Sequence, residues 1–100
     1  MKILVAVATR HGATREIAEN IATSIGAALI DAGVESEVDV RDAGHVESLG
    51  GFDAVVLGSA VYMGHWLEPA RHLAESFSDD LREVPVWLFS SGPAGQQHKP

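Results

Sequence analysis

The run Ile3-Leu4-Val5-Ala6-Val7-Ala8 is apolar at every position, and the polar loop Thr9-Arg10-His11-Gly12-Ala13-Thr14 follows it directly. A strand with one solvent face alternates apolar and polar residues, whereas a strand covered on both faces is apolar throughout. The run therefore predicts a buried strand of a parallel sheet. A second run of this kind, Ala54-Val55-Val56-Leu57-Gly58-Ser59, predicts another.

Between and after these runs the sequence changes from strand-like to helical spacing. Apolar residues at helical spacing predict a helix with Thr14 as a possible N-cap and Gly33 at its end. Its expected apolar stripe is Ile17, Ile21, Ala22, Ile25, Ala28 and Leu29. The other expected segments are a strand at 36–40, a polar connection at 42–51 with room for one helical turn, a loop at 60–66, a helix from Pro69 to Phe77, a polar connection at 79–83, a strand at 84–89 and a glycine-rich turn at 90–95.

This alternation predicts an α/β fold: an open parallel sheet in the order 2-1-3-4 with helices on both faces. In such a sheet three loops meet at the carboxyl edge, where ligands of open α/β sheets bind. They are Thr9–Thr14, Ser59–Trp66 and Ser90–Gly95.

Charge and composition exclude several functions. The net charge of −7 disfavours nucleic acid and anionic lipid, and residues 3–8 are too few to insert stably in a membrane. The absence of cysteine removes thiolate metal sites and the nucleophile of a low-molecular-weight phosphatase. The first loop also lacks the acidic cluster of a phosphorylated receiver domain. We expect no metal site, and a cytoplasmic location.

The first loop suits a phosphate. It opens a helix, whose free N–H groups and dipole favour an anion by about 0.3–1 kcal/mol. Thr9 and Thr14 offer hydroxyls, and Gly12 lets the backbone approach. It is neither a Walker A loop nor a dinucleotide fingerprint. A simple capped turn remains the alternative.

The second loop carries two aromatic residues, Tyr62 and Trp66, together with Met63 and Gly64. Aromatic rings stack in offset geometry on a flat ligand. The alternative is that both rings cover the core. A phosphate cradle beside an aromatic platform fits a phosphorylated flat ring, which indicates FMN.

At these residues the sequence resembles the flavodoxin family. That family holds the FMN phosphate with a Thr/Ser-x-Thr-Gly-x-Thr loop, which Thr9, Gly12 and Thr14 match while His11 replaces the middle threonine. The runs at 9–18 and 56–65 are also similar to the branch that includes menaquinone-dependent protoporphyrinogen dehydrogenases.

The resemblance implies noncovalently bound FMN held by three sets of residues. Around the phosphate it places Thr9, Arg10, His11, Gly12, Ala13 and Thr14; beside the ring Ala60, Val61, Tyr62, Met63, Gly64 and Trp66; and on the ring's far side Ser91, Gly92 and Pro93. No side chain is expected to act as a catalytic acid, base or nucleophile.

A flavodoxin normally continues with a fifth strand and a last helix. We therefore expect a shortened flavodoxin-like domain over 1–95, an unstructured tail at 96–100, and an exposed fourth strand through which homo-oligomers form.

The leading hypothesis is an FMN redox protein that transfers electrons to a redox partner protein or a quinone. One alternative is an oxidoreductase similar to protoporphyrinogen dehydrogenase. The other is a flavodoxin-like module that binds no flavin.

Overall fold

The computed structural model describes residues 1–10 and 12–91; His11, Gly92, Pro93 and the tail expected at 96–100 lie outside them. The elements alternate as predicted. In chain order they are β1 (Lys2–Ala8), α1 (Ala13–Asp31), β2 (Glu37–Asp42), the 3-10 turn η1 (Ala43–His45), β3 (Ala54–Tyr62), β4 (His65–Trp66), α2 (Glu68–Ser76), α3 (Ser78–Leu81) and β5 (Val86–Ser91).

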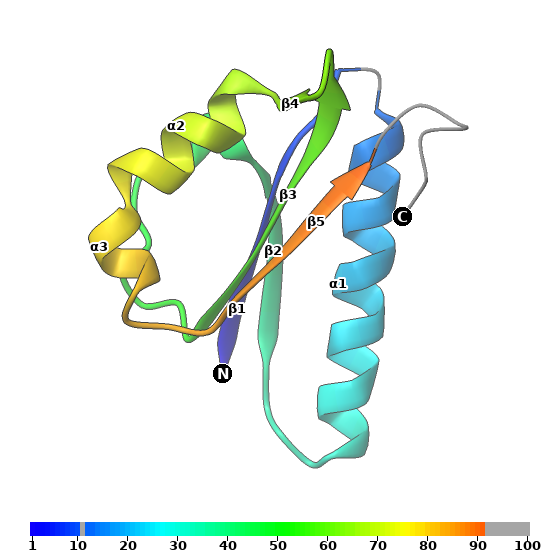
Figure 1. Ribbon diagram of the computed structural model, residues 1–100. Helices are drawn as coiled ribbons and strands as arrows, with labels where there is room; N and C mark the ends of the chain where they lie inside the picture. The colour runs from blue at the N-terminus through cyan, green and yellow to red at the C-terminus, as the bar shows by residue number, and fades with distance from the viewer. Residues whose placement is uncertain (11, 92–100) are drawn as a thin grey trace.

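The sheet has the predicted order. Strand β1 pairs in parallel with β2 on one side and β3 on the other, and β5 pairs in parallel with the far side of β3. The short β4 runs antiparallel to the end of β3. Helix α1 covers one face and helices α2 and α3 cover the other (Figure 1). The flavodoxin-like α/β fold is confirmed.

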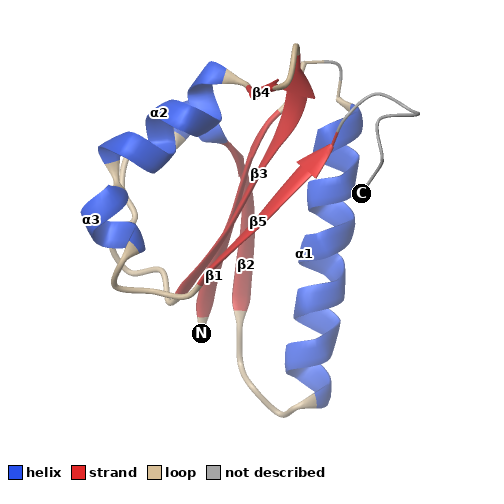
Figure 2. Cartoon of the chain, viewed as in Figure 1, coloured by secondary structure: helices blue, strands red, loops and turns tan. Residues whose placement is uncertain are grey.

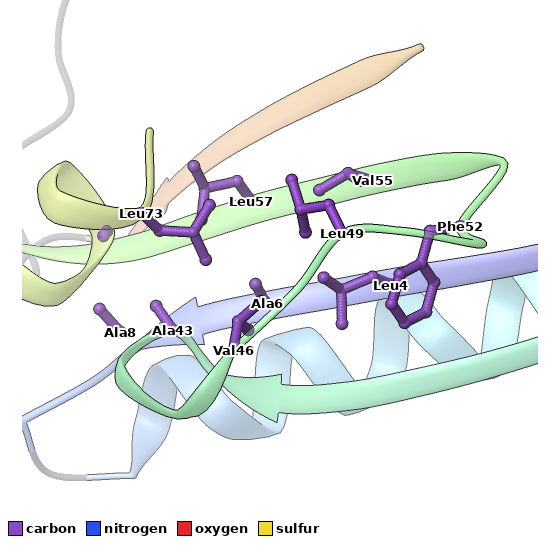
Figure 3. Packing of buried hydrophobic residues seen from close by; sticks show 11 residues of the cluster. Leu4, Ala6, Ala8, Ala43, Val46, Leu49, Phe52, Val55, Leu57 and Leu73 are labelled. Carbon is purple, nitrogen blue, oxygen red and sulfur yellow. The ribbon is translucent and has the colours of Figure 1, made fainter. Parts of the chain in front are cut away.

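The core has two layers because side chains alternate across the central strands. Leu4, Ala6 and Leu57 belong to the layer that includes Leu73 of α2, and Figure 3 shows this larger cluster. Val5, Val7 and Val56 belong to the other layer with Ala18 of α1. Full burial of a valine or leucine side chain contributes about 1.5–3 kcal/mol to the stability of the fold. Both layers draw on β1 and β3, which explains why their sequences are apolar throughout.

The connection at 42–51 contributes to the core. The expected helical turn is present as η1, but Ala43, Val46, Leu49 and Phe52 are buried beneath the α2 layer. These apolar residues recur at every third position. The expectation of a purely polar connection was wrong because that spacing matches neither a strand nor a regular helix.

Helix α1 begins two residues earlier than predicted. Gly12, at φ 88°, is its N-cap, and Thr14 is a buried residue of the first turn. The Gly12 N–H donates to Thr9 Oγ1 at 3.0 Å. This bond closes the turn between β1 and α1 at Gly12, ahead of Thr14. The glycine end is confirmed: Gly33 has φ 75° and donates to Ile30 O at 2.9 Å.

Helix α1 packs through a different set of residues from the predicted stripe. Ala18 is its fully buried apolar residue, whereas Ile17 is exposed and Ala28 also faces solvent. Ile21, Ala22 and Ile25 pack against the sheet as predicted. Because the side chain of Ala18 is small, α1 can lie close to the strands. The spacing of apolar residues in the sequence does not reveal this close approach.

The later strands begin after their predicted first residues. Strand β2 starts at Glu37 instead of 36, and β5 starts at Val86 instead of 84. Pro85 has no N–H and uses its carbonyl to accept from Val55 at 3.0 Å, so the β5 ladder begins after it. Ser90 and Ser91 consequently belong to the strand, and the connection expected at 79–83 contains α3.

Candidate functional site

The ends of the three strands from which the predicted loops leave lie at one edge of the sheet. Ala8 pairs with Ser59, and Ser59 pairs with Ser90, so β1, β3 and β5 reach this edge at the same level. Because the three strands are parallel, their carboxyl ends point the same way (Figure 2). The turn after β1 and the end of β3 are therefore neighbours.

The turn after β1 has the geometry of an anion site. Gly12 adopts a left-handed conformation, and α1 begins at Ala13. Helix geometry leaves the N–H groups of Ala13, Thr14 and Arg15 without partners inside the helix. They carry the positive end of a 19-residue helix.

Thr14 is the most informative residue of this turn. It is 3% exposed, and no hydrogen bond of its hydroxyl is recorded among residues 1–10 and 12–91. A buried hydroxyl without a partner costs about 1–3 kcal/mol. A phosphate oxygen at the start of α1 would supply the missing partner, so these residues fit the phosphate of FMN.

The two arginines flanking the turn differ in their surroundings. Arg15 is held by Asp42 at 2.9 Å and by Glu19 at 3.5 Å, so its charge is balanced. Arg10 takes part in no ion pair within the described part of the chain; its guanidinium lies over the Tyr62 ring, 4.0 Å from the centroid. Arg10 therefore brings an unbalanced positive charge to the edge.

Residues 60–66 form a hairpin, and the expected loop was wrong. Strand β3 continues to Tyr62, the turn is Met63-Gly64, and β4 returns. Met63 has φ 55° and Gly64 has φ 80°, and two positive values in succession match the right-handed twist of a tight hairpin.

The hairpin places its two aromatic side chains on opposite faces. Val61 pairs with Trp66, and Tyr62 pairs with His65, so Tyr62 and Trp66 belong to different cross-strand pairs and point to different sides. Tyr62 is 53% exposed. Trp66 packs against the core and donates from Nε1 to Ser90 Oγ at 2.8 Å. Tyr62 is therefore the ring free to stack on a flat ligand, and Trp66 is an anchor.

Two serines support the hairpin and were not among the predicted site residues. Ser59 is fully buried; its hydroxyl donates to Ala60 O at 2.7 Å and accepts from Leu67 N at 2.9 Å. The Ser90 hydroxyl accepts the hydrogen bond from Trp66 Nε1. A serine at the end of an apolar strand is the one sequence feature that points to Ser59.

The other predicted site residues lie around the same edge. Ala60 and Val61 are half-buried in β3, and Met63 is 79% exposed at the tip of the hairpin. Ser91 pairs with Ala60 across the ladder. His11, Gly92 and Pro93 lie outside the described residues, so their predicted contacts stay predictions.

Within residues 1–10 and 12–91, no group of three or more His, Cys, Asp or Glu side chains is placed to hold a metal ion. None of the helices in this part of the chain combines the length and apolar character needed to cross a bilayer.

Comparison with known proteins agrees with this geometry. A family model described as Flavodoxin domain matches residues 4–100. The chain belongs to the flavodoxin family. No curated protein matches it. The protoporphyrinogen dehydrogenase branch suggested by the sequence is not distinguished by this match.

Solved flavodoxins share the fold. Flavodoxin 2 from Bacillus cereus, in its oxidised form, is 30% identical with a TM-score of 0.66, over 97% of this chain and 65% of that one. A Fusobacterium nucleatum flavodoxin variant bound to flavin mononucleotide is 18% identical with a TM-score of 0.66, over 91% of this chain and 51% of that one. An archaeal flavodoxin is 18% identical with a TM-score of 0.61, over 100% and 85%. This flavodoxin domain thus spans about half to two thirds of the first two structures.

Proposed function

We propose that this flavodoxin domain binds FMN noncovalently at the carboxyl edge of its sheet and serves electron transfer. The observation that carries the proposal is the buried Thr14 at the start of α1, whose hydroxyl makes no hydrogen bond within residues 1–10 and 12–91. An exposed aromatic ring, Tyr62, lies at the same edge of the sheet. The flavodoxin variant from Fusobacterium nucleatum, which shares the fold, holds flavin mononucleotide.

Each part of the site has a distinct task. The N–H groups at the start of α1, with the Thr9 and Thr14 hydroxyls, would hold the phosphate. Tyr62 would stack on the ring, and Met63-Gly64 would bring backbone close to it. FMN, when bound, would supply the redox chemistry. The protein binds and orients the flavin and sets its potential through nearby charge.

Titration of the purified protein with FMN tests this proposal. Stacking against Tyr62 is expected to quench flavin fluorescence, with a dissociation constant in the micromolar range or below. Arg82→Lys, on the far side of the molecule next to Asp79, serves as the control and should bind equally well. Undiminished fluorescence at micromolar protein would leave the third reading, a module without flavin, as the better description.

The electron partner belongs to the same proposal. A redox partner protein or a quinone would exchange electrons with the flavin at the exposed hairpin. Substrate oxidation is the second candidate because the runs at 9–18 and 56–65 are similar to the protoporphyrinogen dehydrogenase branch. Reduction of the bound flavin by a porphyrinogen, followed by reoxidation by a quinone, would favour it. A cytoplasmic location stays a prediction.

Self-association through β5 is a further part of the proposal. Trp87 is 59% exposed and Leu88 66% exposed on this edge strand, next to an apolar groove of about 480 Å³ against Ile21 and Ile25 of α1. A second copy that pairs through its own β5 would provide hydrogen-bond partners for the N–H and C=O groups at the edge of this strand. It would also cover the Trp87 and Leu88 side chains.

Trp87→Lys tests the association. We expect dimers by light scattering at high concentration, and a rise of about tenfold or more in their dissociation constant in the variant, since a charged edge opposes pairing. Ile30→Lys, which places the same charge at a 74% exposed position of α1, should leave the association unchanged. A wild-type protein that is monomeric at every concentration would contradict this expectation.

A further inference from the structure

Arg10 and Tyr62 join the two loops of the site. Arg10 follows β1 and Tyr62 ends β3, and these strands are neighbours in the sheet. The Arg10 guanidinium lies 4.0 Å from the centroid of the Tyr62 ring. The side chain of one loop therefore covers one face of the aromatic residue of the other.

The hairpin that carries Tyr62 is fixed from its other face. Trp66 packs against the core and its Nε1 donates to Ser90 at 2.8 Å, which ties β4 to β5. Tyr62, on the opposite face of the hairpin, belongs to neither buried cluster of residues 1–10 and 12–91 and is 53% exposed. Besides its cross-strand partner His65, Arg10 contacts the Tyr62 ring and restrains it.

We propose that Arg10 is a positioning residue that holds the Tyr62 ring for stacking, so that the phosphate and ring halves of the flavin site act together. This inference rests on the proposed binding of FMN. Arg10 then acts in two ways: its charge attracts the phosphate, and its plane supports the tyrosine.

The chemistry of the guanidinium supports this assignment. A guanidinium is planar, stacks on aromatic faces and remains charged, whereas a lysine ammonium is a compact point charge on a flexible stem. A ring also has two faces. With Arg10 on one face, the exposure of Tyr62 leaves the other accessible to a flat heterocycle.

Two flavins separate the two roles of Arg10. FMN carries a phosphate, and riboflavin is the same ring system without it. A residue that acts through charge alone would affect FMN and leave riboflavin unchanged. A residue that also positions Tyr62 must affect both, and Arg10→Lys should reveal this because it keeps the charge and loses the plane.

The experiment measures dissociation constants of FMN and riboflavin by flavin fluorescence. Arg10→Lys is expected to weaken riboflavin binding by up to about fivefold, because a lysine ammonium retains part of the cation–π attraction and loses the planar stacking. Tyr62→Phe should retain wild-type affinity, because the ring remains. In a Tyr62→Ala background, Arg10→Lys should no longer change riboflavin binding. Arg82→Lys, a matched exchange away from the site, should change neither constant.

The outcomes separate this inference from the proposed function. Unchanged riboflavin affinity in Arg10→Lys, with normal binding by the wild type, would overturn the positioning role alone. A wild-type protein that binds neither flavin would overturn the proposed function and this inference together. An equal effect of Arg10→Lys with and without Tyr62 would also overturn the coupling. Circular dichroism of each variant checks that the fold is retained.

Discussion

Gly58→Ala is expected to lower the free energy of unfolding by about 1–3 kcal/mol, the usual cost of an extra methyl group in a filled space. For a domain of this size each kcal/mol shifts the melting temperature by about 4–8 °C. Gly58 lies in β3, between β1 and β5, opposite Val7 and Phe89. Chemical denaturation followed by circular dichroism measures the loss.

The reason is the position of the Phe89 ring. A Cβ atom built on Gly58 would overlap that ring. The backbone of β3 is fixed by ladders on both sides, so the methyl group cannot move away. Phe89 must instead leave the layer it shares with Val56 and α1, which exposes apolar surface at the edge strand.

Two further variants test whether the effect of Gly58→Ala comes from its overlap with Phe89. Combining Gly58→Ala with Phe89→Ala should cost less than the sum of the two single changes, because the clash disappears with the ring. Gly26→Ala, within α1 and with no atom within 4 Å of the added Cβ, should stabilise the protein by about 0.5–1 kcal/mol. Strict additivity of the Gly58 and Phe89 effects would contradict the overlap.

Sequence patterns were sufficient to predict the central strands of the sheet, because each of these strands is a local run of apolar residues. The apolar runs at 3–8 and 54–59 require cover on both faces, and that requirement specifies helices on either side. The core of the connection beneath α2 was missed, since Ala43, Val46, Leu49 and Phe52 recur at every third position, a spacing that matches neither a strand nor an α-helix. The contact of Gly58 with Phe89 depends on strand register, which composition does not encode.

The sequence predicted which strand ends meet at one edge of the sheet, and only partly the geometry of the residues there. Parallel strands alone bring the loops after β1 and β3 to one edge. A loop was expected at 60–66, yet the positive φ values of Met63 and Gly64 produce a hairpin, and the hairpin separates Tyr62 from Trp66. The contact between Arg10 and Tyr62 joins residues 52 positions apart in the chain, so no local pattern reveals it.

Thr14→Val is expected to raise the FMN dissociation constant by about tenfold or more, the value of a hydrogen bond to a charged group. Valine keeps the branched shape of threonine and removes only the hydroxyl. Riboflavin binding should not change, because riboflavin has no phosphate to accept the bond. Fluorescence titrations with both flavins measure the two constants.

The same variant should leave the flavin-free protein as stable as the wild type, or more stable. The Thr14 hydroxyl is buried, and within the described residues no bond of it is recorded, so its removal takes away a desolvated polar group and exchanges it for a methyl. Thr23→Val, at an exposed position of α1 where the hydroxyl bonds Glu19 O at 3.0 Å, is the matched control and should not alter FMN binding. A loss of stability without a loss of FMN affinity would show that the hydroxyl has a structural partner instead. Opposite effects on stability and affinity are what a group retained for a ligand must show, because no hydrogen bond within residues 1–10 and 12–91 offsets the cost of burying this hydroxyl.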